Sequence, residues 1–153
     1  MRFLFVDRIL DMVPGQSVEA EHVFDAGEDF FRDHFPGFPV VPGVLLTEMM
    51  GQTAAMCLNA ESRETGRGKA MLAQIRSASF REWVRPGERT IVKAEIRSSR
   101  ADYATAACSV EVGGRRVCTA ELLFSFLPPG NLAPGYRDEV LESYLASRDR
   151  GKG

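Results

Sequence analysis

A histidine, a glycine and a glutamate in one short stretch carry the chemistry that this sequence offers. His34 can exchange a proton near neutral pH, and Glu48 stands in an apolar segment. A carboxylic acid in apolar surroundings tends to keep its proton, which it can then donate. Gly43 stands where a helix is predicted to begin, and the first backbone N–H groups of a helix lack intrahelical partners. A base, an acid and a donor for a negative oxygen together indicate acid–base chemistry beside a carbonyl group.

The residues between His34 and the predicted helix form a stiff loop. Pro36, Pro39 and Pro42 fix their own φ angles and push the residues before them toward extended conformations. Gly37 adds a position that can adopt a positive φ. We expect this loop to hold His34 in place.

A helix is predicted from about Val44 to Asn59. Apolar residues occur on nearly every side of this segment, which is typical of a buried helix. Glu48 and Gln52 are four residues apart and therefore share one face. Two other interpretations remain open: Glu48 could be solvated at an edge or a subunit contact, and His34 could be a satisfied structural histidine.

Strands are predicted on both sides of this helix. Two strands, 3–12 and 17–25, flank a turn at Pro14-Gly15. After the helix and a polar loop at 61–69, the hydrophobic period changes to two, with Gly113-Gly114 as a hairpin signal. No helices alternate with the later strands, so the sequence predicts an α+β fold, with an antiparallel sheet of about six strands wrapped around one long central helix.

The end of the chain differs in character from the rest. Residues 1–127 are predicted to form one domain. Residues 128–153 begin with a Pro- and Gly-rich loop, continue into a short amphipathic helix at 137–147 and end in a flexible tail.

Composition restricts the partners. The chain has 153 residues, a formal net charge of -2 and no apolar run long enough to span a membrane, so we expect neither nucleic acid nor membrane as a partner. Cys57, Cys108 and Cys118 have no metal-like spacing, and we expect no metal and no cofactor. Reduced thiols and a start without a signal peptide predict a cytoplasmic protein.

The stretch from residue 30 to 52 resembles the signature of the 3-hydroxyacyl-acyl carrier protein dehydratases of bacterial fatty acid synthesis. The resemblance continues in "FLFVDRIL" (3–10) and "FREWVRPGE" (80–88) and covers roughly residues 3–127. Such a long run at unbroken spacing is far more specific than a short motif. The matching residues are Phe30, Phe31, His34, Phe35, Pro36, Pro39, Val40, Pro42, Gly43, Val44, Leu45, Glu48 and Gln52.

The resemblance implies a hotdog fold and a role for each matched residue. His34 would remove the α-proton of a (3R)-hydroxyacyl thioester, and Glu48 would protonate the departing hydroxyl. The N–H of Gly43 would bind the thioester carbonyl. The carbonyl of Val40 would orient His34, and Gln52 would support Glu48 or a water molecule. The family places His34 and Glu48 of different chains in one site, which implies a homodimer or a trimer of dimers.

The resemblance also implies a substrate tunnel and a protein partner. The partner would be acyl carrier protein, with Arg76, Arg81 and Arg85 as candidate contacts for its phosphopantetheine phosphate. The acyl chain would run in an apolar tunnel along the helix, although each candidate lining residue also fits an ordinary core position. These candidates are Phe35, Phe38, Met49, Met50 and Met56.

Several positions depart from the family pattern. Asp33 replaces the glycine before the histidine, Gly51 replaces an alanine, and Trp83 stands where a proline is usual. We expect Asp33 to remove a flexible position and to weaken His34 as a base. Two other functions remain open: a hotdog acyl thioesterase, and a catalytically silent dehydratase-like partner subunit.

Overall fold

The computed structural model describes residues 1–151 and contains six strands and two α-helices in that range. Short 3-10 helices lie at Asp29–Arg32 and Pro129–Asn131. The main elements are β1 (Arg8–Val13), β2 (Ser17–Val23), α1 (Gly43–Thr65), β3 (Lys69–Phe80), β4 (Arg89–Ser99), β5 (Tyr103–Val112), β6 (Arg115–Leu127) and α2 (Glu139–Gly151).

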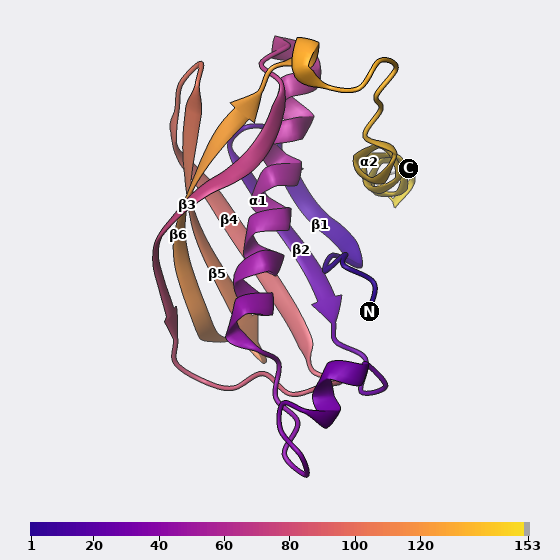
Figure 1. Cartoon of the computed structure of the whole chain (residues 1–153), viewed down its shortest axis with the longest axis vertical. Helices are drawn as coiled ribbons and strands as arrows, with labels where there is room; N and C mark the ends of the chain where they lie inside the picture. Colours follow the sequence, from indigo (N-terminus) through magenta and orange to yellow (C-terminus); the bar gives the residue numbers. More distant parts are fainter. Residues whose placement is uncertain (152–153) are drawn as a thin grey trace.

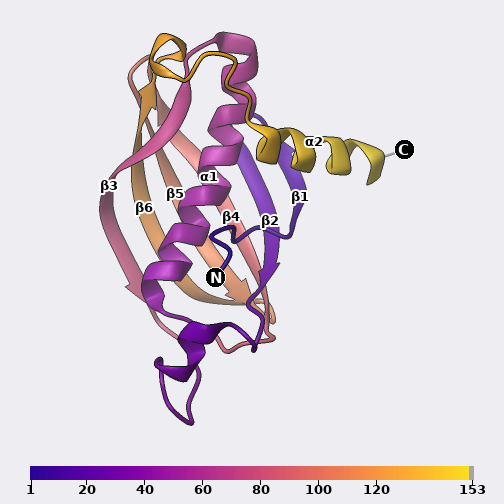
Figure 2. The same ribbon diagram turned by 45° about the vertical axis from the view of Figure 1, so that its right-hand side comes forward.

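The six strands form one antiparallel sheet in the order β1-β2-β4-β5-β6-β3. The sheet curves around α1, which lies lengthwise along its inner face (Figures 1 and 2). This arrangement confirms the predicted α+β class and the hotdog fold.

The core lies between α1 and the inner face of the sheet. In β5, Ala104, Ala106, Cys108 and Val110 are all buried, as their alternation predicts. Met49, Met50, Ala54 and Leu58 of α1 are 0% exposed. Helix and sheet therefore bury each other's apolar faces.

The strand β3 is different, because it lies at an edge of the sheet. After Lys69 and the buried Ala70, every residue from 71 to 80 is exposed, including the large side chains of Met71, Leu72, Ile75 and Phe80. Its alternating pattern predicted a strand correctly but did not predict this exposure. A long, exposed apolar edge is a surface that proteins normally cover.

Glycine defines the tight turns that the sequence indicated. Gly113 and Gly114 have φ angles of 58° and 79°, the paired positive values of a type I′ hairpin. Gly15 has a φ of 74°, and the N–H of Gln16 donates to the carbonyl of Val13 at 2.9 Å. Both predicted turns are confirmed.

Two element boundaries differ from the prediction. The helix α1 continues through the predicted polar loop to Thr65 and ends at Gly66, whose φ of 72° forms the left-handed C-cap. The first strand begins at Arg8 rather than residue 3. Before it, the N–H of Phe5 and the carbonyl of Phe3 are hydrogen-bonded to the Gln52 side chain on α1, so this segment crosses the helix instead of extending the sheet.

The C-terminal helix packs onto the domain. It lies across β1 and beside α1 (Figure 2). Leu141 and Leu145 are buried, and the hydroxyl of Tyr144 donates a hydrogen bond to the carbonyl of Val6. The helix is longer than the predicted 137–147, and of the expected flexible tail Lys152 and Gly153 lie outside the described residues. No helix among residues 1–151 is long and apolar enough to cross a membrane.

Candidate active site

The loop that holds His34 is built from two consecutive turns. The N–H of Asp33 caps the 3-10 turn at Asp29–Arg32 by donating to the carbonyl of Phe30 at 3.2 Å, and the N–H of His34 donates to the same carbonyl at 3.0 Å. Phe35 and Phe38 then exchange two backbone hydrogen bonds around Pro36-Gly37, where Gly37 has a φ of 73°. Proline followed by a positive-φ glycine is the pattern of a type II turn. The His34–Phe35 peptide bond is cis.

The His34 ring is oriented by a hydrogen bond to the loop itself. Its Nδ1 lies 3.0 Å from the carbonyl oxygen of Val40. Because a carbonyl oxygen only accepts, Nδ1 must carry the proton, and Nε2 of the neutral ring keeps a free lone pair. The N–H of Val40 in turn donates to the His34 carbonyl at 3.1 Å. Val40 therefore fixes the tautomer that leaves Nε2 able to act as a base.

The start of α1 presents unsatisfied backbone donors. Its N-cap residue is Pro42, which makes no side-chain cap, and the first turn has no acidic residue. Gly43 is close to the Phe80 ring. A Cβ atom added to Gly43 would lie only 3.2 Å from a ring carbon. Gly43 therefore lets the ring approach the helix start, and the N–H groups there suit a developing negative oxygen.

Glu48 is half-buried on α1 and is held by Gln52. The amide nitrogen of Gln52 donates to Glu48 Oε1 at 3.1 Å and to the carbonyl of Phe3 at 3.3 Å. The amide oxygen of Gln52 accepts the N–H of Phe5 at 2.8 Å. Gln52 thus joins the N-terminal segment to the carboxyl group.

His34 and Glu48 are in separate places within one chain. No hydrogen bond or ion pair joins them among the interactions of residues 1–151. Glu48 and Gln52 line a groove of about 400 Å³ beside α1 whose lining does not include His34. The loop that carries the candidate base and the groove that contains the candidate acid are therefore two separate regions of one chain.

The candidate tunnel residues lie in three different environments. Phe35 and Phe38 are on the His34 loop and are 49% and 41% exposed. Met49 and Met50 are fully buried in the core, where Met50 Sδ lies 4.0 Å from Cys118 Sγ. Met56 is 8% exposed and contacts the groove beside Glu48. Their tunnel role stays a prediction.

Asp33 occupies a position that needs no glycine. Its φ and ψ angles are -99° and -20°, which any residue can adopt. The side chain is exposed, and no ion pair among residues 1–151 joins it to His34. Asp33 therefore replaces the family's glycine without backbone strain.

The three thiols are buried and unsuited to nucleophilic chemistry. Burial raises the pKa of Cys57 and Cys118 to about 11. Burial, with a smaller effect from Cys118, raises the pKa of Cys108 to about 12. Thiolate is the reactive form of cysteine, so these side chains are structural at neutral pH.

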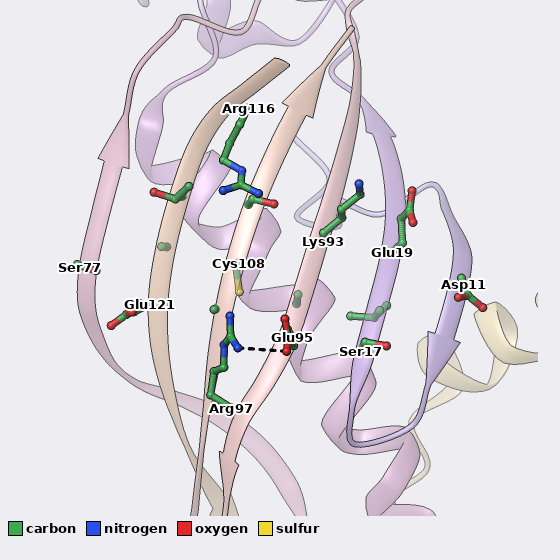
Figure 3. Close-up of a pocket in the computed structure, with 16 residues that line it drawn as sticks. Asp11, Ser17, Glu19, Ser77, Lys93, Glu95, Arg97, Cys108, Arg116 and Glu121 are labelled. Carbon is green, nitrogen blue, oxygen red and sulfur yellow. Dashed lines mark hydrogen bonds and ion pairs between the residues drawn. The ribbon is translucent and has the colours of Figure 1, made fainter. Parts of the chain in front are cut away.

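A hollow of about 540 Å³ on the outer face of the sheet contains none of the predicted site residues. Figure 3 shows acidic and basic side chains on neighbouring strands there, with Arg97 paired to Glu95 at 3.2 Å. Lys93 pairs with Glu111 at 3.3 Å. This surface is a charged, solvated face.

The sequence analysis assigned no role to three residues of the site region. Phe80, which lies beside Gly43, belongs to the matching segment "FREWVRPGE", but the resemblance gave it no function. Tyr136 and Val140 line the Glu48 groove from the C-terminal segment, which the family resemblance does not cover.

Comparison with known proteins defines the family. The model of the FabA-like domain matches residues 1–121. The chain belongs to the FabA-like family. The 3-hydroxyacyl-[acyl-carrier-protein] dehydratase FabZ of Lactiplantibacillus plantarum is 36% identical over 121 residues, which are 79% of this chain and 82% of that protein. FabZ of Listeria welshimeri is 37% identical over 124 residues, covering 80% of this chain and 85% of that protein.

Solved structures agree with this FabA-like assignment at the level of the fold. The dehydratase heterocomplex ApeI:P from Xenorhabdus doucetiae matches with a TM-score of 0.69 at 12% identity and covers 84% of this chain and 86% of that one. A mutant of the phenylacetic acid degradation protein PaaI from Thermus thermophilus matches with a TM-score of 0.61 at 19% identity, covering 78% and 92%.

Proposed function

We propose that this FabA-like protein dehydrates (3R)-hydroxyacyl-acyl carrier protein to trans-2-enoyl-acyl carrier protein in fatty acid or related lipid or polyketide biosynthesis. The observation that carries the proposal is the 3.0 Å hydrogen bond between His34 Nδ1 and the Val40 carbonyl. It leaves Nε2 of a half-buried histidine free to accept a proton, which a merely structural histidine would not require.

The reaction uses the three groups that the sequence singled out. Nε2 of His34 takes the α-proton, and the carbon–hydrogen electron pair becomes the new double bond. The N–H of Gly43 stabilises the negative charge that develops on the thioester oxygen. The C3–oxygen bond then breaks, Glu48 transfers its proton to the hydroxyl, and water leaves. No cofactor takes part.

In this proposal a homodimer brings the His34 loop of one chain to the Glu48 groove of the other. The edge strand β3 pairs on one side with β6, is open on the other among the described strands, and is rich in exposed apolar side chains, so a second copy can add its own β3 there. In such a dimer His34 faces Glu48 of the partner subunit. Three dimers can associate further without changing this pairing.

The acyl carrier protein docks at the His34 end of the molecule. The Arg85 guanidinium lies 5.7 Å from the centre of the Phe38 ring, and the Phe38 ring lies 5.2 Å from that of Trp83. Exposed Arg76, Arg81 and Arg85 are available to a phosphopantetheine phosphate. Three free, buried cysteines fit a reducing compartment, and we place the protein in the cytoplasm.

The test is the hydration of trans-2-enoyl thioesters by His34→Asn and Glu48→Gln. Each variant should lose about 10²- to 10⁴-fold in kcat/KM, the usual worth of a general acid or base. Glu64→Gln, an exposed position on the same helix, is the matched control and should retain activity. Circular dichroism should show that all three variants keep the fold. Turnover at the parental rate by both His34→Asn and Glu48→Gln would refute the proposed roles.

A further inference from the structure

The groove that contains Glu48 follows α1 toward its C-terminal end. Glu48, Gln52, Ala55 and Asn59 line it at helical spacing. Between Glu48 and Asn59 the helix advances by about 16 Å, at about 1.5 Å per residue. The groove is therefore elongated, with the carboxyl group toward one end.

The C-terminal segment forms the opposite end of this groove. Tyr136, Asp138, Val140 and Leu141 contribute to its lining, together with Lys69 at the start of β3. The connection that leads into this segment lies at the end of α1 opposite the His34 loop (Figure 1). Residues 136–141 follow the stretch that the family model matches, which ends at residue 121, whereas Lys69 lies within it.

Exposed apolar side chains gather around the groove. Met71 and Leu72 of β3 are 46% and 40% exposed, and Tyr136 and Val140 are 43% and 44% exposed. Several polar groups at the Asn59 end already have partners: Asn59 Oδ1 accepts the N–H of Ala70 at 2.7 Å, and Lys69 pairs with Asp138 at 2.9 Å. The wall of the groove therefore favours an apolar occupant over a charged one.

Several contacts hold the C-terminal wall of the groove, residues 136–141, against the domain. Lys69 Nζ lies 2.9 Å from Asp138 Oδ2 and 5.2 Å from the centre of the Tyr136 ring. Leu141 and Leu145 are buried against the domain. A wall held by an ion pair, a cation–π contact and buried leucines can limit the length of a ligand.

We propose that residues 136–141 close the far end of the acyl-binding groove and thereby set the longest acyl chain that the enzyme accepts. The occupant is the linear apolar chain of the substrate, whose reacting carbons lie near Glu48. This inference rests on the proposed dehydratase function, because that function places the thioester at the Glu48 end.

The test changes the size of Val140 in both directions. Val140→Ala should raise the ratio of kcat/KM for trans-2-dodecenoyl over crotonyl thioester by about fourfold for each methylene that the longer groove admits. Val140→Trp should lower the same ratio. Val13→Ala and Val13→Trp are matched controls, because Val13 is 42% exposed and lies outside the groove; their ratio should stay at the parental value.

A binding measurement separates this inference from the proposed function. Displacement of a fluorescent fatty acid by acyl thioesters, measured in the His34→Asn background, should give the same change in chain-length preference without turnover. Absence of turnover in the parent would contradict the dehydratase function. Unchanged preference in both Val140 variants would overturn the closed groove alone. If the Val140 variants change their sedimentation while their chain-length preference stays at the parental value, a second copy of the chain occupies the groove. That result would also overturn the closed groove.

Discussion

Single residues orient the two side chains that we propose for proton transfer. His34 is oriented by the Val40 carbonyl, and Glu48 is held by Gln52, which also binds the backbone of Phe3 and Phe5. Both N–H groups and the oxygen of the Gln52 amide are engaged, so its orientation is determined by three partners at once. Gln52 therefore couples the position of residues 3–5 to the orientation of the Glu48 carboxyl group.

Substitutions of Asp33 test whether the charge next to His34 in the sequence affects turnover. The Asp33 side chain is exposed, and no ion pair among residues 1–151 joins it to His34. Asp33→Gly and Asp33→Asn should therefore both keep or raise kcat/KM at pH 7. Because the backbone at this position has a φ of -99°, glycine is not required there, and only Asp33→Gly should lower stability, by about 0.5–1 kcal/mol. A collapse in rate in both variants would show that the carboxylate is itself functional.

The buried thiol of Cys108 should make the free energy of unfolding decrease as the pH becomes alkaline. Burial raises its pKa to about 12 in the folded protein, whereas an unfolded thiol ionises near pH 8.5. Its contribution is fully present below about pH 8.5 and is lost as pH rises toward the folded value. In urea unfolding between these limits, Cys108→Ala should show a pH slope shallower by up to about 1.4 kcal/mol per unit. Equal slopes would mean that the thiol ionises alike in both states.

At the scale of elements, the sequence predicted what depends on local periodicity. The apolar residues around Val44–Asn59 predicted the central helix, and period two predicted the later strands. The helix end at Gly66 was missed because a polar surface turn of helix resembles a loop in composition. The crossing of residues 3–5 over α1 depends on the side chain of Gln52, a long-range contact that no local pattern reveals.

The connection between α1 and β3 should be sensitive to one glycine. Gly68 has a φ of 113°, and a Cβ there would lie 2.2 Å from the carbonyl oxygen of Leu127. Gly66 has a φ of 72° but nothing within 4 Å of such a Cβ. Gly66→Ala should cost about 1–2 kcal/mol from backbone strain alone. Gly68→Ala should cost about 1–3 kcal/mol more, from the added clash, and equal costs in urea unfolding would contradict the close approach.

At the scale of the whole molecule, the proposed site includes surfaces that one chain leaves exposed. The motif predicted the His34 loop and the Glu48–Gln52 pair, because both are made by residues close in sequence. The exposed β3 edge and the groove wall at Tyr136 and Val140 arise from segments far apart in the chain. A hydrophobic pattern in the sequence cannot distinguish an apolar side chain that is buried in the core of its own chain from one that is exposed and binds another molecule.

Mixing two inactive variants tests whether the site is shared between chains. If His34 acts with Glu48 of the partner subunit, a heterodimer of His34→Asn and Glu48→Gln has one intact site and one doubly altered site. Random exchange in an equimolar mixture makes half of the dimers heterodimers, so activity should recover to about a quarter of the parental value. Each variant unfolded and refolded alone is the control and should stay inactive. If the mixture stays inactive although size-exclusion chromatography of differently tagged chains shows exchange, then both groups act within one chain, and the dimeric site is disproved.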